Sequence, residues 1–429
     1  MLSTECRKAI KALIQQEVVP AMGCTEPIAV SLCTARATET LGLLPEKITV
    51  LLSPNVLKNA MGVGIPGTDM IGLPIAIALG AVVGKSEYGL EVLRDVCPEA
   101  VAKGRAMIEE GRITVALKEG GCDMLYIEVV AEGEGNKATA IISGAHTNFV
   151  HIERNGEVLA SQQTEEKEVA QNKPLALNLR TVWEYATESP LEELEFILEA
   201  RRLNKAAADE SLRGEWGHCL GRTLQNSSLG QNIIGNTPLS HMISYTSAAC
   251  DARMGGAKIP VMSNSGSGNQ GIVSTLPVVV YAEDMGCGEE QVVRALILSH
   301  LTAIYIKQSL GRLSALCGCV VASTGSSCGI TYLMDGGYQE VAMAVKNMVA
   351  TLTGMICDGA KPSCALKLSS AVSTAVMAAT MAIEHHCVTS YEGIVDDDVD
   401  RSILNLTSIG SRGMLATDKM ILDIMTHKK

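Results

Sequence analysis

The sequence predicts a mixed α and β fold: a mainly helical domain with an inserted α+β domain built on an antiparallel sheet. The chain has 429 residues, more than a single hydrophobic core usually organises, so at least two domains are expected. Hydrophobic residues make up 47% of the chain but aromatic ones only 3%, which is typical of closely packed helices with small residues at their crossings. Short alternating segments precede residue 160, and long helical patterns follow it.

The chain divides into three predicted parts. Residues 1–44 are expected to form N-terminal helices that join the helical domain, residues 45–160 the α+β domain, and residues 161–429 the helical domain. The charged stretch from Thr164 to Lys173 is interpreted as a linker or an exposed turn between the last two parts.

The N-terminal part combines an amphipathic pattern with a cysteine near a helix start. Residues 3–18 are expected to form an amphipathic helix. Thr25 is expected to cap a second helix that begins at Pro27, because proline is favoured in a first turn. Cys24 would then lie just before a helix N-terminus, where the helix dipole lowers the pKa of a thiol. A buried thiol beside an ordinary cap is the alternative.

Alternating apolar residues from Lys47 onward predict a mostly antiparallel sheet. A Gly-rich stretch at 62–68 lacks the ending of a Walker loop. Its backbone N–H groups are expected either to hold a carboxylate or to form an ordinary turn before a helix at 72–83. The expected strands are Ile48–Ser53, Ile113–Leu117, Met124–Val130, Ala138–Ile142 and Val150–Glu153.

Helical periodicity dominates the second half of the chain. Between its apolar segments, Ser263 to Gly271 combines glycines with Ser, Asn and Gln. We interpret this polar loop, held between buried segments, as a ligand site and not as a flexible tether. The long helical segments are Pro190–Leu203, Glu290–Ser309, Tyr338–Thr353 and Cys364–His385.

Charge and cysteine content exclude several classes of protein. The formal net charge of −12 argues against binding to nucleic acid or to an anionic membrane surface. The 14 cysteines lie in a long chain without a recognisable signal peptide, so we expect reduced thiols and a cytoplasmic protein. The runs 70–84 and 365–383 are too short or too interrupted to span a membrane. An acidic, apolar-rich chain is compatible with a homodimer.

Cys317, Cys357 and Cys364 are flanked by Gly, Ser and Asp at the ends of apolar helices. Small neighbours let the backbone approach a bulky inorganic group, and thiolates are the usual ligands of iron–sulfur clusters. We predict that these three residues, joined by Cys24, hold such a cluster. Their wide spacing favours a cluster with one open iron over an electron carrier with a compact C-x-x-C motif. The alternative is that they are small buried apolar residues.

Histidine is the natural general base near neutral pH. We prefer His146, because Gly144 and Asn148 place it in a turn. His300 lies in an apolar segment and is interpreted as a core histidine, and His151 as a strand residue that packs or forms hydrogen bonds.

Specific motifs run from one end of the chain to the other: Gly23–Pro27, Ser53–Asn55 with Lys58–Asn59, Pro66–Thr68, Gly144–Asn148, Asp251–Ala257, Ser263–Gly271, Leu313–Cys317 and Gly354–Ala360. Together they resemble the L-cysteine desulfidase family, a serine dehydratase-like group. The resemblance implies a [4Fe-4S] cluster, no pyridoxal phosphate, and conversion of L-cysteine to pyruvate, ammonia and sulfide. It implies Cys24, Cys317 and Cys357 as the ligands.

The chain is also similar, more distantly, to the catalytic domain of bacterial iron–sulfur L-serine dehydratases. In that group the third cluster cysteine follows the second closely, which implies Cys364 in place of Cys24. The loop Gly144–Asn148 resembles the His-Pro-Asn-Thr loop of those enzymes but lacks its proline. We interpret Cys319 and Cys328 as packing residues.

These likenesses lead to a hypothesis for the reaction. The amino acid meets the open iron, His146 removes its α-proton, and the β-sulfur leaves. Alternatives are the same elimination with L-serine and a non-catalytic amino-acid-binding protein, and pyridoxal phosphate on Lys58 or Lys258 is disfavoured. The residues predicted to bind the small amino-acid substrate are Asn55, Lys58, Asn59, Arg253, Ser265, Ser267, Asn269 and Gln270.

Overall fold

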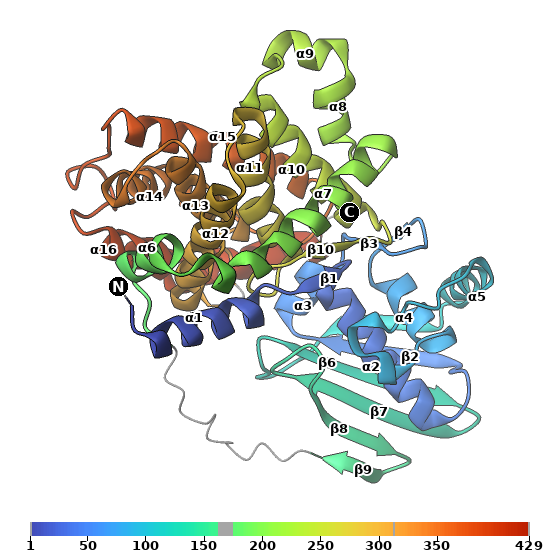
Figure 1. Cartoon of the computed structure of the whole chain (residues 1–429). Coiled ribbons are helices and arrows are strands. Elements are labelled where there is room, and N and C mark those ends of the chain that lie inside the picture. Colours follow the sequence, from blue (N-terminus) through green and yellow to red (C-terminus); the bar gives the residue numbers. More distant parts are fainter. Residues whose placement is uncertain (1, 162–174, 312–313, 428–429) are drawn as a thin grey trace.

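The computed structural model describes residues 2–161, 175–311 and 314–427. They form two hydrophobic cores, one among helices and one between helices and a sheet (Figure 1). A mainly helical architecture with an α+β part confirms the predicted fold class. The predicted linker from Thr164 to Lys173 lies outside the described residues.

A six-stranded sheet forms the base of the α+β part. Its strands are β2 (Lys47–Leu52), β5 (Ile113–Leu117), β6 (Tyr126–Gly133), β7 (Asn136–Ser143), β8 (Phe149–Arg154) and β9 (Glu157–Ser161). They lie in the order β5-β2-β6-β7-β8-β9, and every pair is antiparallel except β2 with β5. In β6 the side chains of Ile127, Val129 and Ala131 are buried, and the residues between them are half-buried. This alternation is expected of a sheet covered on one face.

Helices cover one face of this sheet (Figure 1). They are α2 (Thr25–Leu41), α4 (Leu73–Val82) and α5 (Pro98–Glu109). α2 lies on β6 and β7, and α4 packs between α2 and α5. A Cβ at Gly80 would lie 2.5 Å from the carbonyl oxygen of Ser31, so the close crossing of α2 and α4 requires glycine there. Because α2 precedes residue 45, the core of the sheet extends beyond the predicted α+β segment. The division into domains stays a prediction.

The N-terminal segment connects the two parts. α1 (Thr4–Glu17) packs in the helical core through Ile10 and Ile14, which confirms the predicted amphipathic helix. β1 (Pro20–Met22) then pairs antiparallel with β10 (Pro260–Met262). The chain therefore passes beside the polar loop at 263–271 just before it reaches Cys24.

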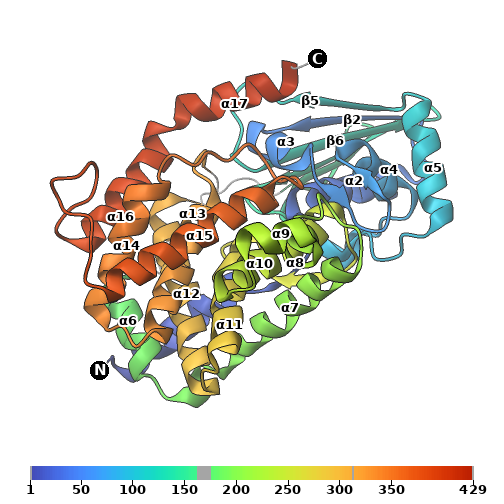
Figure 2. The same ribbon diagram turned by 90° about the horizontal axis from the view of Figure 1, so that it is seen from above.

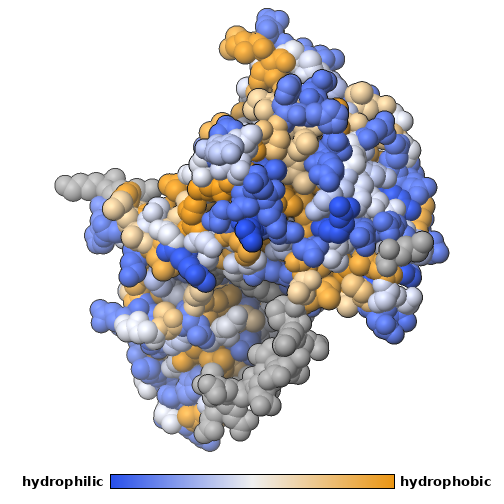
Figure 3. Space-filling view, turned by 90° about the vertical axis from the view of Figure 1, so that its left-hand side faces the viewer, coloured by the Kyte–Doolittle hydropathy of each residue, from blue (hydrophilic) through white to orange (hydrophobic). Residues whose placement is uncertain are grey.

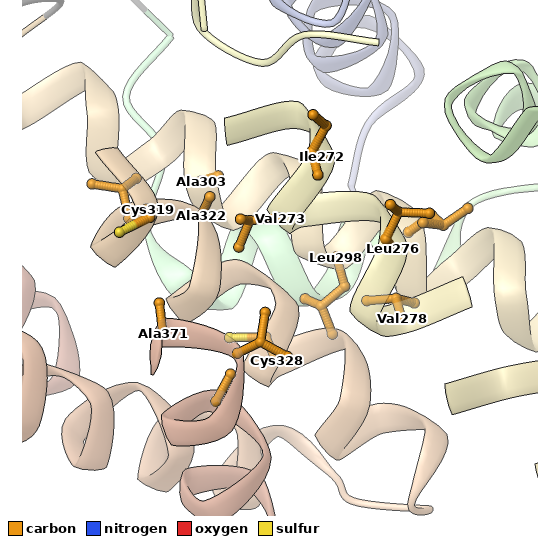
Figure 4. Packing of buried hydrophobic residues seen from close by; sticks show 14 of the residues in the cluster. Ile272, Val273, Leu276, Val278, Leu298, Ala303, Cys319, Ala322, Cys328 and Ala371 are labelled. Atoms are coloured by element: carbon orange, nitrogen blue, oxygen red, sulfur yellow. The ribbon is translucent and has the colours of Figure 1, made fainter. Parts of the chain in front are cut away.

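Six helices form the centre of the helical part. They are α10 (Pro238–Gly255), α11 (Gly268–Met285), α12 (Glu289–Leu310), α13 (Gly318–Leu333), α14 (Tyr338–Leu352) and α15 (Cys364–Ile383). A Cβ at Gly325 of α13 would lie 2.2 Å from the carbonyl oxygen of Ser299 on α12, so small residues do allow the close crossings that the composition predicts. Cys328 packs in this core near Leu298 and Ala371 (Figure 4), in agreement with its interpretation as a packing residue.

Two predicted boundaries in the helical part were wrong. The polar loop is shorter than expected, because α11 already begins at Gly268 and the Ser267 hydroxyl accepts a hydrogen bond from the Gln270 N–H (3.4 Å). The helix expected from Pro190 begins instead as two 3₁₀ turns, and the α-helix starts at Leu198.

The remaining elements include short helices that surround the two cores. A pair of them, α8 and α9, projects from the molecule and exposes Leu229 and Ile233 at a hydrophobic tip (Figures 1 and 3). In chain order the remaining elements are α3 (Pro54–Ala60), β3 (Gly64–Ile65), β4 (Met70–Ile71), η1 (Ser86–Glu91), α6 (Leu179–Glu188), η2 (Leu191–Glu193), η3 (Glu195–Ile197), α7 (Leu198–Arg213), α8 (Leu220–Asn226), α9 (Ser228–Ile234), α16 (Val399–Ser408), the π-helical turn η4 (Ile409–Gly413) and α17 (Leu415–His427).

Among the described residues, α15 is the one helix long and apolar enough to cross a membrane. The sequence had led us to expect that Lys367 and several serines interrupt this run too strongly. Its residues Ala371, Val372 and Ala375 are buried in the helical core, and the helix packs against α10, α13 and α14. One face of α15 therefore lies in the helical core.

Candidate active site between the two parts

A cavity of about 340 Å³ lies where the helical part meets the sheet part. Residues of α2, α3 and the loop after β7 line it from one side. Residues of α10, α11, α12, α13 and α15, with the loops before α13 and α15, line it from the other. All of the site residues predicted from the sequence border this single cavity: Cys24, Asn55, Lys58, Asn59, His146, Arg253, Ser265, Ser267, Asn269, Gln270, Cys317, Cys357 and Cys364.

Cys317 and Cys357 lie side by side because their backbones pair. The Cys317 N–H donates to the Met355 carbonyl (2.9 Å), and the Cys357 N–H donates to the Ala315 carbonyl (2.6 Å). This short bridge brings two thiols about forty positions apart in the sequence close enough for each to shift the pKa of the other. Cys319, two residues into the same segment, places its Sγ 3.2 Å from the Sγ of Cys317.

Cys364 is the first residue of α15 and lines the same wall. Its Sγ lies 3.6 Å from the carbonyl oxygen of Gly359, in the turn that follows Cys357. Gly359 has a φ of 89°, and a Cβ there would lie 2.1 Å from the carbonyl oxygen of Lys58. The Asp-Gly pair singled out in the sequence therefore lets this turn contact the sheet part.

Three of the thiols on this wall, those of Cys317, Cys357 and Cys364, have raised pKa values. A hydrogen bond from Cys319 and burial raise the pKa of Cys317, and contact with Cys317 and burial raise the pKa of Cys357. Burial raises the pKa of Cys364. Among the described residues, no three His, Cys, Asp or Glu side chains converge closely enough to hold one metal ion. A buried wall of soft sulfur donors does fit a larger thiolate-ligated group such as an iron–sulfur cluster.

Cys24 faces the cavity from the sheet part. Its Sγ donates to Glu26 Oε2 (3.0 Å) and lies 3.9 Å from the Asn59 carbonyl. The prediction that a helix N-terminus lowers its pKa was wrong: burial first, and then the negative charge of Glu26, raise the pKa of this thiol. The predicted cap was also wrong, because α2 begins at Thr25 and Cys24 occupies the N-cap position.

Glu26 is a cavity residue that the sequence reading missed. Its carboxylate also accepts hydrogen bonds from Thr25 Oγ1 (3.2 Å) and Asn59 Nδ2 (3.3 Å). Asn59 therefore holds Glu26, in addition to bordering the cavity. The motif Gly23–Pro27 could have pointed to Glu26, because its carboxylate lies two positions after Cys24.

Three buried polar atoms on the cavity wall have no hydrogen-bond partner within the described part of the chain. They are Asn55 Oδ1, Arg253 Nε and Gln270 Oε1. Buried polar atoms almost always have partners, so three such atoms around one cavity indicate a polar ligand. They include one donor with a positive charge and two neutral acceptors.

Arg253 is fixed by its neighbours. It is only 4% exposed, and its Nη1 donates to Asn269 Oδ1 (3.0 Å). A Cβ at Gly268 would lie 2.2 Å from Arg253 Nε, so the glycine of the polar loop makes room for the guanidinium. Asn269 therefore orients Arg253 in addition to bordering the cavity, and its direct contact with substrate stays a prediction.

The two predicted serines serve the loop itself. Ser265 Oγ donates to Asn264 Oδ1 (2.8 Å), and Ser267 caps α11. Asn264 in turn donates to Nδ1 of His300 (3.1 Å). His300 is fully buried, and burial lowers its pKa to about 3, which confirms its interpretation as a core histidine.

His146 is half-buried in the loop after β7. Asn148 Nδ2 donates to the Ser143 carbonyl (2.9 Å) and closes this loop, so His146 lies in a turn as predicted.

By contrast, no residue of the Gly-rich stretch 62–68 belongs to the described cavity wall. A Cβ at Gly64 would meet the backbone of Gly255 at 2.5 Å, so this stretch serves packing.

Four cations border the cavity, and Glu26 is the one anion among its described lining residues. Lys58 and Arg253 were expected, whereas Lys307 and Lys367 were missed because they lie inside helices. Lys58 pairs with Asp418 (2.5 Å), and Lys367 pairs with Asp358. Carboxylates outside the cavity lining thus neutralise two of the four cations.

Comparison with known proteins identifies the relatives of this chain. Residues 87–423 match the model of the family described as serine dehydratase alpha chain. The chain belongs to the serine dehydratase alpha chain family. This membership indicates a lyase and leaves its substrate open.

Several relatives match along nearly their whole length. A UPF0597 protein of Phocaeicola vulgatus is 64% identical over 429 residues, with all of both chains covered. One from Bacteroides fragilis is 65% identical over 98% of each chain, and one from Oleidesulfovibrio alaskensis is 46% identical over the full length of both. Their names state no substrate, so they support the family at a coarser level than L-cysteine desulfidase.

Proposed function

We propose that the protein is an iron–sulfur-dependent lyase that converts L-cysteine to pyruvate, ammonia and sulfide. One observation carries the proposal. A single cavity presents Cys317, Cys357 and Cys364 on one wall and unpartnered polar atoms of Asn55, Arg253 and Gln270 around it. Family membership supports a lyase, and the motif resemblance supports this substrate.

The proposed cofactor is a [4Fe-4S] cluster. Cys317 and Cys357 would hold it, because the backbone bridge between Leu316 and Ile356 brings the two cysteines together on the cavity wall. Cys364 or Cys24 would be the third ligand. When bound, such a cluster supplies a Lewis acid at its open iron that assists departure of the β-substituent.

The unpartnered atoms favour one orientation of a zwitterionic amino acid. Its carboxylate would accept from Arg253 Nε, which is buried, charged and without a partner in the described chain. Its ammonium would donate to Asn55 Oδ1 and Gln270 Oε1. In this orientation the carboxylate and the ammonium of the substrate would each have a hydrogen-bond partner. The β-substituent of the substrate would then point toward the cysteine wall.

His146 is the proposed general base. It would take the proton from Cα as the Cβ–S bond breaks and sulfide leaves, and the resulting aminoacrylate would hydrolyse to pyruvate and ammonium. The neighbouring hydrogen bond from Asn148 to Ser143 keeps His146 in its turn at the cavity. A half-buried imidazole on the cavity wall suits this role, because histidine is the most common general base in enzymes.

The central experiment is iron and sulfide analysis of anaerobically purified protein. The parent should be brown and contain iron. Cys317→Ala and Cys357→Ala should each lose most of it, whereas Cys97→Ala, which alters an exposed cysteine away from the cavity, should keep it. A colourless, iron-free parent would instead favour a non-catalytic amino-acid-binding protein.

L-Serine is the second candidate substrate, favoured by the family description itself. The same elimination would release water in place of sulfide. Pyruvate release from both amino acids, with sulfide measured in parallel, distinguishes them: a higher kcat/KM for L-serine would reject L-cysteine as the main substrate. A cytoplasmic location, a homodimer and the absence of nucleic-acid or membrane partners remain predictions.

A further inference from the structure

The C-terminal helix α17 bridges the two parts of the molecule. Figure 2 shows it crossing from the helical part toward the sheet part, where it contacts α3. Its Leu422 belongs to the sheet core, and α3 carries Lys58 on its last turn. None of the described residues of α17 lines the cavity.

α17 is connected to the cysteine wall at its other end. It follows the π-helical turn η4, in which Gly410 is buried. A Cβ at Gly410 would lie 2.5 Å from Leu310 Cδ1 and 3.0 Å from Leu316 Cβ. Leu316 directly precedes Cys317. The C-terminal segment therefore touches both walls of the cavity from outside.

One charged contact joins α17 to the cavity. Lys58 Nζ lies 2.5 Å from Asp418 Oδ1. The Lys58 side chain is 3% exposed and borders the cavity, whereas Asp418 is 25% exposed and lies behind it. The carbonyl oxygen of Lys58 also packs against Gly359, two residues after Cys357.

We propose that Asp418 is a positioning residue that holds the Lys58 ammonium at the cavity wall. A buried ion pair is a weak source of stability, because desolvation offsets much of the attraction. The location of the Lys58–Asp418 pair beside the cavity indicates a role in positioning the lysine. Asp418 neutralises a buried cation from outside the cavity and fixes the position of the Lys58 side chain along the cavity wall. Docking of α17 thereby completes the cavity wall. The kinetic part of this proposal rests on the proposed function.

The test compares Asp418→Asn, Asp418→Glu and Asp423→Asn in the full chain. Asp418→Asn keeps the shape of the side chain and removes its charge, and Asp418→Glu keeps the charge. Asp423→Asn makes the same change on the same helix, at an exposed residue that pairs only with His427 among the described ion pairs (3.1 Å). The first readout is acetylation of Lys58 by acetic anhydride, followed by mass spectrometry, which requires neither iron nor turnover.

We expect Lys58 to be acetylated about tenfold faster in Asp418→Asn than in the parent, because an unpaired ammonium leaves the buried wall. Asp418→Glu should restore most of the protection, and Asp423→Asn should match the parent. An equal Lys58 rate in Asp418→Asn and the parent overturns the proposal, whatever the activity.

The second readout is steady-state kinetics. In Asp418→Asn the KM for the amino acid should rise about tenfold, with kcat changed less and iron content unchanged. A lower melting temperature with an unchanged KM would show a purely structural role and overturn the proposal. If the parent turns over neither L-cysteine nor L-serine, the proposed function fails, and the acetylation rates still decide the role of Asp418.

Discussion

The two walls of the cavity differ in what their thiols touch. On the helical wall, formed by the helical part of the chain, the Sγ of Cys317 lies 3.2 Å from the Sγ of Cys319, and a backbone bridge brings Cys357 beside them. On the sheet wall, Cys24 contacts the carboxylate of Glu26. Soft donors gathered together suit a metal cluster, and a mixed set of carboxylate, amides and ammonium suits a small polar ligand. We infer from this difference that the helical wall holds the metal, and that the sheet wall supplies the proposed base His146 together with polar contacts to the substrate.

The largest expected difference between the two walls concerns which of them supplies the third cysteine ligand of the proposed cluster. If the helical wall alone holds the cluster, Cys364→Ala should lose iron by more than about tenfold, whereas Cys24→Ala should keep it and lose affinity for substrate. The measurement is iron per chain after anaerobic reconstitution. The reverse pattern would show that the two walls share the metal and would break the distinction drawn here.

The next largest effect is expected at Arg253, the buried donor that α10 presents on the helical wall. Arg253→Ala should raise the KM for the amino acid by roughly 10–150-fold, because a hydrogen bond to a charged group is worth about 1.5–3 kcal/mol. Arg253→Lys should recover only part of it, since an ammonium lacks the guanidinium fork. Iron content serves as the control: loss of iron in Arg253→Ala would place this residue with the metal instead of the substrate.

The pH dependence of the free energy of unfolding should report the burial of His300 in the helical core. The pKa of His300 is about 3 in the folded protein and about 6.5 in an unfolded chain. Its neutral form is therefore favoured by folding, so this contribution is complete above pH 6.5 and is lost as the pH falls toward 3. At pH 5 the loss should be about 2 kcal/mol.

Urea unfolding at pH 7 and pH 5 measures this contribution as the difference between the parent and His300→Gln. The variant should lose less stability between the two pH values than the parent does. Equal losses would mean that His300 titrates normally and that its site is more hydrated than the structure indicates.

The smallest expected effect lies on the sheet wall. Asn148→Ala removes the hydrogen bond to Ser143 that closes the His146 loop. We expect a loss of about 1 kcal/mol in the free energy of unfolding and a severalfold lower kcat, measured by urea titration and pyruvate release. An unchanged kcat with the same loss of stability would argue against His146 as the base.

The sequence predicted which residues line the cavity, but it did not predict which of them contact one another. Cysteines beside Gly and Asp, and a polar loop between apolar flanks, are local signals, and these residues do line one cavity. The roles of Asn269 and Asn59 were not visible, because each acts through a neighbour from another segment. Glu26 and Lys367 were missed because a charged residue in a helix is usually a solvated one.

The sequence by itself determined the fold class, the amphipathic and alternating segments, and which residues carry reactive groups, because these follow from local periodicity and composition. Only the tertiary structure decided which groups meet. It paired Cys317 with Cys357 through a backbone bridge, set Cys24 against Glu26, and brought Asp418 to Lys58 across 360 positions. Burial and neighbouring charge then fixed the direction of each pKa shift, because both depend on atoms that are distant in the chain and close in space.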